Sequence, residues 1–234
     1  MKENRVKPYG VIIGIVSVAL QHGLYLGAHK LSLIVGNTPV CPKISAIDDL
    51  IPIISLFLIP YAWSYVYWAM APMAVSKCST AHFKKYIAAY IISCLMGAVI
   101  IIFMPTYMDR AAEGLTAEPT PEILRFWYTL DGGDMAYNLF PSFHCINSTI
   151  SYLGVMGRKE IPKWYRIYSL VLTVLIYVAT VTVKQHYIVD VLGGIAIAFI
   201  GWFTVTAFCF VYRAARQKTF ICEKSTQSQH QSEL

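Results

Sequence analysis

The sequence is poor in charge. Asp, Glu, Lys and Arg together make up 14% of its 234 residues, against roughly 25% in a soluble domain of this size. Hydrophobic residues make up 56%, and the mean hydropathy is +0.53. The shortage of charge excludes an ordinary soluble domain and predicts a polytopic integral membrane protein.

Cysteine is too scattered to build a site. We find no Cys-x-x-Cys pair and no Cys/His cluster with metal-ligand spacing, nor a group of carboxylates of the kind that holds Mg²⁺. Most cysteines fall in or near apolar segments, where Cys behaves as a small apolar residue. The six are Cys41, Cys78, Cys94, Cys145, Cys209 and Cys222. We therefore predict no disulfide framework, no metal and no other cofactor.

The chain also lacks an internal repeat of useful strength and any sign of a second domain. Residues 219–234 are polar and rich in Gln and Ser, a composition typical of disorder. We predict a single transmembrane domain over residues 1–218 and a disordered cytoplasmic tail over residues 219–234.

Apolar runs near the roughly 20 residues that span a bilayer occupy most of the chain. Gln21 and His22 weaken the first run, and the fourth is so short that it spans only if it is tilted or starts deep. The first follows a basic start like that of a signal peptide, but it lacks a convincing small-x-small cleavage site, so we interpret it as an uncleaved anchor. The six runs cover residues 9–34, 50–71, 86–104, 143–156, 167–183 and 188–212. The predicted fold is an all-α bundle of six transmembrane helices.

Basic residues orient this bundle. Of the 19 Lys and Arg residues, 14 fall on the side that holds both termini and 5 on the other. Because cytoplasmic loops carry the excess of Lys and Arg, both termini are predicted to be cytoplasmic. The net charge of +6 is then a topology signal and requires no nucleic-acid partner. The longer loops, and any chemistry they carry, are placed outside or in a lumen.

The tetrapeptide Pro141-Ser142-Phe143-His144 stands where the long outer loop meets the fourth run. Ser142 after a proline is a good helix N-cap, which places His144 in the first helical turn. A helix N-terminus offers free N–H groups and partial positive charge, which suit a phosphate. A plain capped helix with an interfacial histidine explains the same residues, and the tetrapeptide alone favours that simpler interpretation.

His186 and Asp190 open the sixth run at i and i+4, so on a helix they share a face. A carboxylate there can hold one imidazole N–H and leave the other nitrogen as a nucleophile or base. An ionisable residue at membrane depth is costly, which favours a function. An interfacial histidine beside a snorkelling aspartate is the alternative.

Arg110 follows the third run, and a lone arginine there is usually a contact to lipid headgroups. Arg110, His144 and His186 nevertheless all fall at the outer ends of their runs, and these ends can converge in a compact bundle. Two imidazoles, a carboxylate, a guanidinium and a helix N-terminus would form a phosphoryl-transfer site that needs no metal.

This pattern resembles the type 2 phosphatidic acid phosphatase superfamily, with its motifs KxxxxxxRP, PSGH and SRxxxxxHxxxD on a six-helix core. Residues 141–144 match the second motif, with Phe143 in place of Gly. Residues 186–190 match the HxxxD half of the third and are followed by Val-Leu-Gly-Gly, as in many members. The resemblance covers roughly residues 48–205 and is closest to the branch of inositolphosphotransferase-like and sphingolipid-synthase-like proteins.

The chain departs from the pattern at its cationic positions. The first motif is reduced to Arg110, with Ala111 where Pro is usual and Phe103 in the Lys position. In the third motif Ala179 and Thr180 replace Ser and Arg. Lys184, two residues before the histidine, is a candidate for the missing charge.

The resemblance implies a role for each site residue. His186 would take the phosphoryl group, and Asp190 would orient the His186 imidazole. His144 would protonate the leaving oxygen and then activate the incoming water or alcohol. It implies no metal. The phosphate oxygens would be held by Arg110, Lys184, Ser142 and the backbone N–H of Phe143.

The predicted function is a membrane lipid phosphatase or phosphotransferase that forms a phosphohistidine on the non-cytoplasmic face, with a lipid phosphate and the bilayer as its partners. A transferase of phosphoalcohol headgroups, similar to inositolphosphorylceramide or sphingomyelin synthases, is an alternative. A non-catalytic lipid transporter is another, favoured by the missing Lys and Arg. Against it, His144, His186 and Asp190 are all present, and ionisable groups gather at the ends of runs rather than at mid-membrane. No catalytic role is predicted for the other histidines, His22, His29, His82 and His230, and His22 is interpreted as a polar contact between helices.

Overall fold

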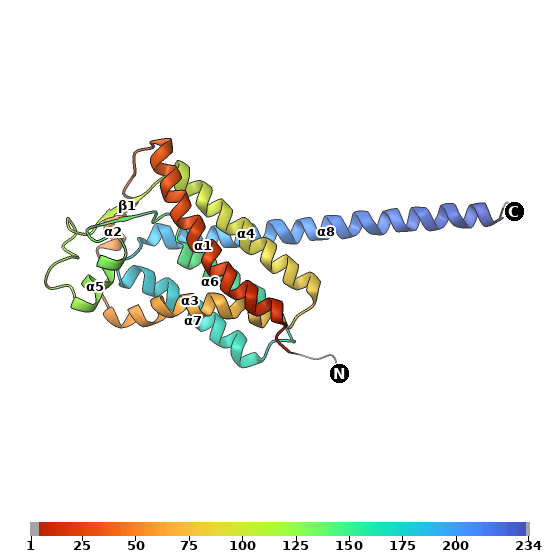
Figure 1. Cartoon of the computed structure of the whole chain (residues 1–234), viewed down its shortest axis with the longest axis horizontal. Helices are drawn as coiled ribbons and strands as arrows, with labels where there is room; N and C mark the ends of the chain where they lie inside the picture. Colours follow the sequence, from red (N-terminus) through yellow and green to blue (C-terminus); the bar gives the residue numbers. More distant parts are fainter. Residues whose placement is uncertain (1–4, 233–234) are drawn as a thin grey trace.

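The protein folds as a bundle of long helices in this computed structural model, which describes residues 5–232, with side chains through residue 216 (Figure 1). It is 70% helix and 4% strand, so the prediction of a helical bundle is confirmed. The main helices are α1 (Pro8–Val35), α3 (Leu58–Val75), α4 (Thr80–Phe103), α6 (Phe143–Val155), α7 (Lys163–Thr182) and α8 (Ile188–Ser232).

Within the described residues, four helices are long and apolar enough to cross a membrane, and they fit an integral membrane protein. They are Pro8–Val35, Thr80–Phe103, Lys163–Thr182 and Ile188–Arg216 within α8. At 1.5 Å per residue, the 13 residues of α6 extend about 20 Å, less than the roughly 30 Å of a bilayer core. α3 has 18 residues, several of them Tyr, Trp or Pro. Six transmembrane spans therefore remain a prediction.

The second predicted run is displaced along the chain. It was expected over residues 50–71, but α3 begins at Leu58 after the short 3-10 helix η1 (Ser55–Phe57) and ends at Val75. Pro60 would have lain in the interior of the expected helix, where proline removes a hydrogen bond and clashes, whereas it falls in the first turn of α3, where it is tolerated.

α6 is the centre of the bundle and packs against α3, α4, α7 and α8. Every residue from Phe143 to Val155 is buried apart from Tyr152, which is half-buried. At its C-terminal end, Gly154 O contacts His82 Nε2 in the first turn of α4 at 2.8 Å. At its N-terminal end, Phe143 packs on Gly97, and α4 continues for six residues, about 9 Å, beyond Gly97. The start of α6 is therefore recessed inside the bundle.

A small cap closes this end of the bundle, which we call the loop end, opposite the N- and C-termini in Figure 1. The strands β1 (Tyr107–Asp109) and β2 (Met135–Tyr137) pair antiparallel, with Met108 opposite Ala136. The helix α5 (Glu122–Leu130) buries Leu124 and Tyr128 against them. The remaining helix of the cap is α2 (Ser45–Asp48). The strand pair was not predicted.

α8 runs away from the bundle as a single helix toward the C-terminus (Figure 1). Its backbone is helical to Ser232, whereas disorder was expected from residue 219. Residues 233–234 lie outside the described part of the chain. The division into a domain over residues 1–218 and a tail remains a prediction.

Candidate active site

The first turn of α6 presents one imidazole. Ser142 is the N-cap, and its Oγ accepts a hydrogen bond from the Cys145 backbone N–H at 3.4 Å, which confirms the predicted cap. His144 follows in the first turn. Its ring stacks on Tyr61 with a centroid distance of 4.1 Å and meets the edge-on rings of Tyr65 and Trp68 at 5.7 and 5.0 Å. These rings from α3 fix the orientation of the imidazole.

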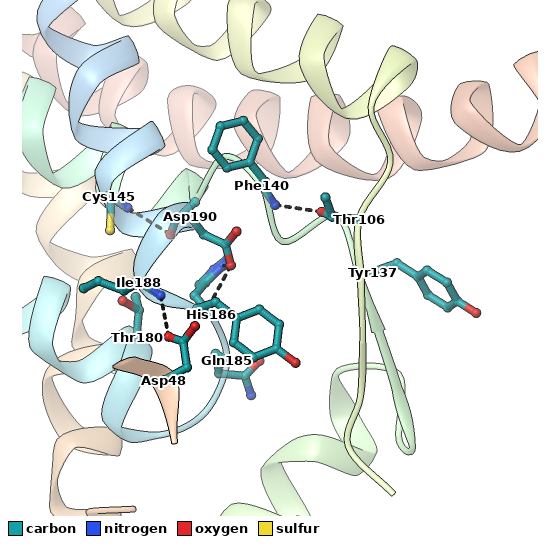
Figure 2. A network of polar contacts seen from close by, with 12 residues as sticks. Asp48, Thr106, Tyr137, Phe140, Cys145, Thr180, Gln185, His186, Ile188 and Asp190 are labelled. Carbon is teal, nitrogen blue, oxygen red and sulfur yellow. Dashed lines mark hydrogen bonds and ion pairs between the residues drawn. The ribbon is translucent and has the colours of Figure 1, made fainter. Parts of the chain in front are cut away.

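A second imidazole stands just before α8. His186 Nδ1 lies 3.4 Å from Asp190 Oδ2, and the Asp190 side chain is fully buried (Figure 2). α8 begins at Ile188, so His186 is held by the preceding turn and not by the helix that the i, i+4 spacing suggested. The contact is long for a hydrogen bond, as is common before a substrate binds. Asp190 Oδ2 also accepts the Tyr187 backbone N–H at 2.8 Å, which anchors the carboxylate.

The two motifs are bound directly to each other. The Ser142 backbone N–H donates to Asp190 O at 3.0 Å, so the start of α6 is tied to the first turn of α8. Gly194 allows this approach, because a Cβ there would lie 2.5 Å from Ser142 O. The rings of His144 and His186 are consequently 6.1 Å apart between centroids. The structure brings together the three predicted catalytic residues.

Both imidazoles line one cavity at the loop end, whose empty space of about 530 Å³ includes the part that opens to solvent. Its walls come from α1, α3, α6, the segment around β2 and the turn before α8. Among the described residues that line it, none is Lys or Arg. The lining residues are Gln21, His22, Tyr25, Tyr61, Tyr65, Asp131, Ala136, Tyr137, Leu139, Phe143, His144, Gln185 and His186.

Arg110 lies behind this cavity and is fully buried. One terminal nitrogen donates to Asp131 O at 2.8 Å and Gly133 O at 3.1 Å. The other donates to Asp131 Oδ2 at 2.8 Å and Gln185 Oε1 at 2.7 Å. Both terminal nitrogens are therefore occupied by the protein, whereas Nε is buried without a hydrogen-bond partner among the described residues.

Gln185 is a site residue that the sequence reasoning missed. It is buried and lines the cavity, and its Oε1 accepts from Arg110. Its Nε2 has no hydrogen-bond partner among the described residues. An uncharged amide gave no ionisable signal, and only its position next to His186 could have drawn attention to it.

Two predicted phosphate ligands direct their side chains elsewhere. Lys184 Nζ donates to Asp48 O at 2.9 Å, and Lys184 does not line the cavity. Burial lowers the pKa of the Lys184 ammonium, although the nearby carboxylates of Glu113 and Asp48 act in the opposite direction. Ser142 uses its hydroxyl for the cap. Phe143 lines the cavity, and its N–H belongs to the first turn, where helical donors lack intrahelical partners.

Asp48, the first residue of the acidic pair Asp48-Asp49, supports the start of α8. Its side chain is buried, and Oδ1 accepts the Ile188 backbone N–H at 2.9 Å (Figure 2). Its Oδ2 accepts the Ile44 backbone N–H at 2.7 Å. Asp48 therefore ties α2 to the turn that carries His186.

Comparison with known proteins identifies the family. The family model described as the PAP2 superfamily matches residues 46–204, more than half of the chain. No curated protein and no solved structure matches the chain. The match includes both histidine motifs and excludes α1, and it suggests an activity of the phosphatase or phosphotransferase type. The predicted branch stays a prediction, but the chain belongs to the PAP2 superfamily, that of the type 2 phosphatidic acid phosphatases.

Proposed function

We propose that the protein cleaves a lipid phosphate ester through a phosphohistidine at His186. The observation that carries this proposal is that His144 and His186 line one cavity and that the buried Asp190 contacts His186. A buried carboxylate behind one imidazole and a second imidazole nearby supply an oriented nucleophile and a separate proton donor.

The first half of the reaction forms the phosphoenzyme. His186 Nδ1 faces Asp190, so Nε2 attacks phosphorus, and the bond from phosphorus to the lipid oxygen breaks. His144 gives its proton to that oxygen, and the lipid alcohol leaves. Asp190 stabilises the positive charge on the phosphorylated imidazole, since a buried carboxylate acts strongly in a low dielectric.

The second half reverses these roles. His144 takes a proton from an incoming water or alcohol, whose oxygen attacks phosphorus. The bond from phosphorus to Nε2 breaks, and His186 recovers its lone pair. Water gives hydrolysis and a lipid alcohol gives transfer, so the two activities share one nucleophilic step.

The phosphate oxygens need donors, and the cavity offers a limited set. Gln185 Nε2 is unpartnered among the described residues and stands next to His186, and the N–H of Phe143 lies at a helix N-terminus. Arg110 acts in this proposal through Gln185. It donates to Oε1 of the Gln185 amide, so the N–H₂ group of that amide points away from the guanidinium. In this proposal the side chains of Lys184 and Ser142 do not contact the phosphate. They hold neighbouring segments of the site in place.

The membrane side follows from the distribution of basic residues. The site lies at the loop end, whereas 14 of the 19 Lys and Arg residues belong to the terminal segments and loops that the sequence assigns to the opposite side. We therefore place the site on the non-cytoplasmic face, with both termini in the cytoplasm.

One observation favours the second candidate, a transferase of phosphoalcohol headgroups. No Lys or Arg among the described residues lines the cavity, and the charge of Arg110 is balanced by Asp131. A phosphate monoester carries up to two negative charges and a diester carries one. A site without a free cation suits the diester better.

Purified protein in detergent micelles tests both candidates with phosphatidate, a monoester, and phosphatidylglycerol, a diester. Released inorganic phosphate and diacylglycerol are measured together. We expect turnover that is lost in His186→Ala and kept in His29→Gln, a control because His29 contacts Asn138 at 3.2 Å and does not line the cavity. Turnover that persists in His186→Ala would reject the phosphohistidine.

A further inference from the structure

The first helix, which lies outside the family match, forms one wall of the catalytic cavity. Gln21, His22 and Tyr25 of α1 line it together with His144 and His186. α1 is held close by Gly10 and Gly14, where a Cβ would lie 2.5 Å from Ser76 Cβ and 2.3 Å from Ala69 O. The position of α1 beside the cavity therefore depends on the close packing of the bundle at these two glycines.

Gln21 is the unusual member of this wall. Its side chain is 4% exposed, and its Oε1 has no hydrogen-bond partner among the described residues. It lies near the middle of a 28-residue helix that is apolar enough to cross a membrane. Polar groups at such depth are costly and normally pair with a neighbouring helix. A buried acceptor without a partner costs stability, which a bound donor would restore.

The neighbours of Gln21 on the same face are satisfied by the protein. Ser17, Gln21 and Tyr25 follow each other at four-residue intervals and share one face. Ser17 Oγ donates to Gly14 O at 3.0 Å, and Tyr25 Oη donates to Tyr137 O at 3.0 Å. Among these three, only the residue between them, which lines the cavity, has a buried side-chain oxygen with no hydrogen-bond partner among the described residues.

The chemistry of an amide selects the ligand. A carbonyl oxygen accepts and an amide N–H₂ donates, a combination that matches a hydroxyl group. The oxygens of an ionised phosphate are acceptors only and give Oε1 nothing to bind. The partner of Gln21 is therefore the alcohol part of a substrate and not its phosphate, whose place is on the wall formed by His144, His186 and Gln185.

We propose that Gln21 binds a hydroxyl group of the alcohol that is joined to the phosphate or that receives it, and that α1 thereby determines substrate specificity. This inference rests on the proposed function. His22 is exposed and stacks on Tyr25 with a centroid distance of 6.5 Å, so it stands at the mouth of the same subsite.

The test replaces Gln21 by methionine, which keeps the length of the side chain and removes its hydrogen bonding. The control is Leu20→Met, because Leu20 is 45% exposed and does not line the cavity. Phosphatidylglycerol, with hydroxyls on its headgroup, is compared with phosphatidylethanol, which has none. Release of diacylglycerol is measured without an acceptor alcohol.

We expect Gln21→Met to lower kcat/KM for phosphatidylglycerol about tenfold, equivalent to about 1.4 kcal/mol, and to leave phosphatidylethanol unchanged. In a second arm of the experiment, phosphatidylethanol is the substrate and labelled diacylglycerol is added as the acceptor alcohol. A loss confined to transfer in that arm assigns the bound hydroxyl to the acceptor instead. An equal loss on both lipids, or no loss in either arm, overturns the proposal.

Failure of the proposed function is a separate result. It appears as wild-type protein that cleaves neither lipid, or as turnover that survives His186→Ala. Binding then tests the subsite alone, with native mass spectrometry of the His186→Ala chain and the two lipids. A preference for phosphatidylglycerol that disappears with Gln21→Met supports the subsite, and equal binding of both lipids rejects it.

Discussion

Replacing Arg110 by alanine is expected to reduce stability much more than replacing Arg125, although both arginines form ion pairs in the cap. Arg110 is fully buried and makes four side-chain hydrogen bonds. Its loss leaves Gln185 and two backbone carbonyls without their donor. Arg125 pairs with Glu118, whose side chain is 78% exposed, so water replaces the lost partner.

The expected magnitudes follow from burial. Breaking a buried ion pair costs about 3–5 kcal/mol. Because the Asp131 side chain is 46% exposed, we expect Arg110→Ala to lower the free energy of unfolding by about 3 kcal/mol, the lower end of this range. An exposed pair is worth about 0–1 kcal/mol. At roughly 2–4 °C per kcal/mol for a chain of this size, Arg110→Ala should lower Tm by about 6–12 °C and Arg125→Ala by less than about 4 °C.

Thermal unfolding in detergent, followed by tryptophan fluorescence, measures both variants, and activity is assayed well below either Tm. Because Arg110 orients Gln185, kcat should also fall while KM changes little. Arg110→Lys should rescue poorly, since one ammonium cannot replace a planar fork of donors. If Arg110→Ala kept the wild-type Tm and raised KM alone, the guanidinium would be a direct phosphate ligand, and the buried clamp would be refuted.

Three further predictions follow from the proposed chemistry and topology. His144→Ala should lower activity on a lipid phosphate about 10²–10⁴-fold, yet it should still release a burst of nitrophenol from an aryl phosphate, whose leaving group needs no proton. An equal loss of activity on both substrates would contradict the role of His144 as an acid. Activity should survive EDTA, because neither half of the reaction uses a metal, and restoration by Mg²⁺ after loss would contradict the mechanism. In a cysteine-free background, a cysteine near Lys84 should label from the cytoplasm and one near Gly132 from outside, and the reverse result would invert the orientation.

That the three residues proposed as catalytic would lie close together could be predicted because the signals are local. Ser142 caps the helix that carries His144, as the order of proline and serine indicated. His186 and Asp190 are close in sequence, so a turn before the helix brings them together almost as a helix would. Such contacts depend on a few neighbouring residues and survive an error in the helix boundary.

The surroundings of Arg110 could not be predicted in the same way. Asp131 lies 21 residues later in the chain, and three of the acceptors around the guanidinium are two backbone carbonyls and a glutamine amide. Carbonyl groups occur at every residue and leave no mark in a sequence. The strands that place them are three residues each, too short for an alternating pattern.

The position of α1 was also beyond the sequence. The apolar residues of α1 form no periodic stripe that would indicate which face meets the bundle. Gln21 and His22 therefore counted only as weak points of a transmembrane segment. In the structure they are the polar part of a cavity wall, which is the other reason for polar residues at membrane depth.

The shortness of α6 explains why the site lies where it does. A helix of full length would end level with α4, and its N-terminal N–H groups would meet water. α6 begins at the level of Gly97, inside the bundle, where unpaired N–H groups are costly. Ser142 Oγ satisfies the N–H of Cys145, and the other first-turn residues, Phe143 and His144, line the cavity together with His186 and Gln185. An anion bound there would complete the hydrogen bonding of a buried helix start, so the feature that made this run a poor transmembrane segment is the one that suits it to hold a phosphate.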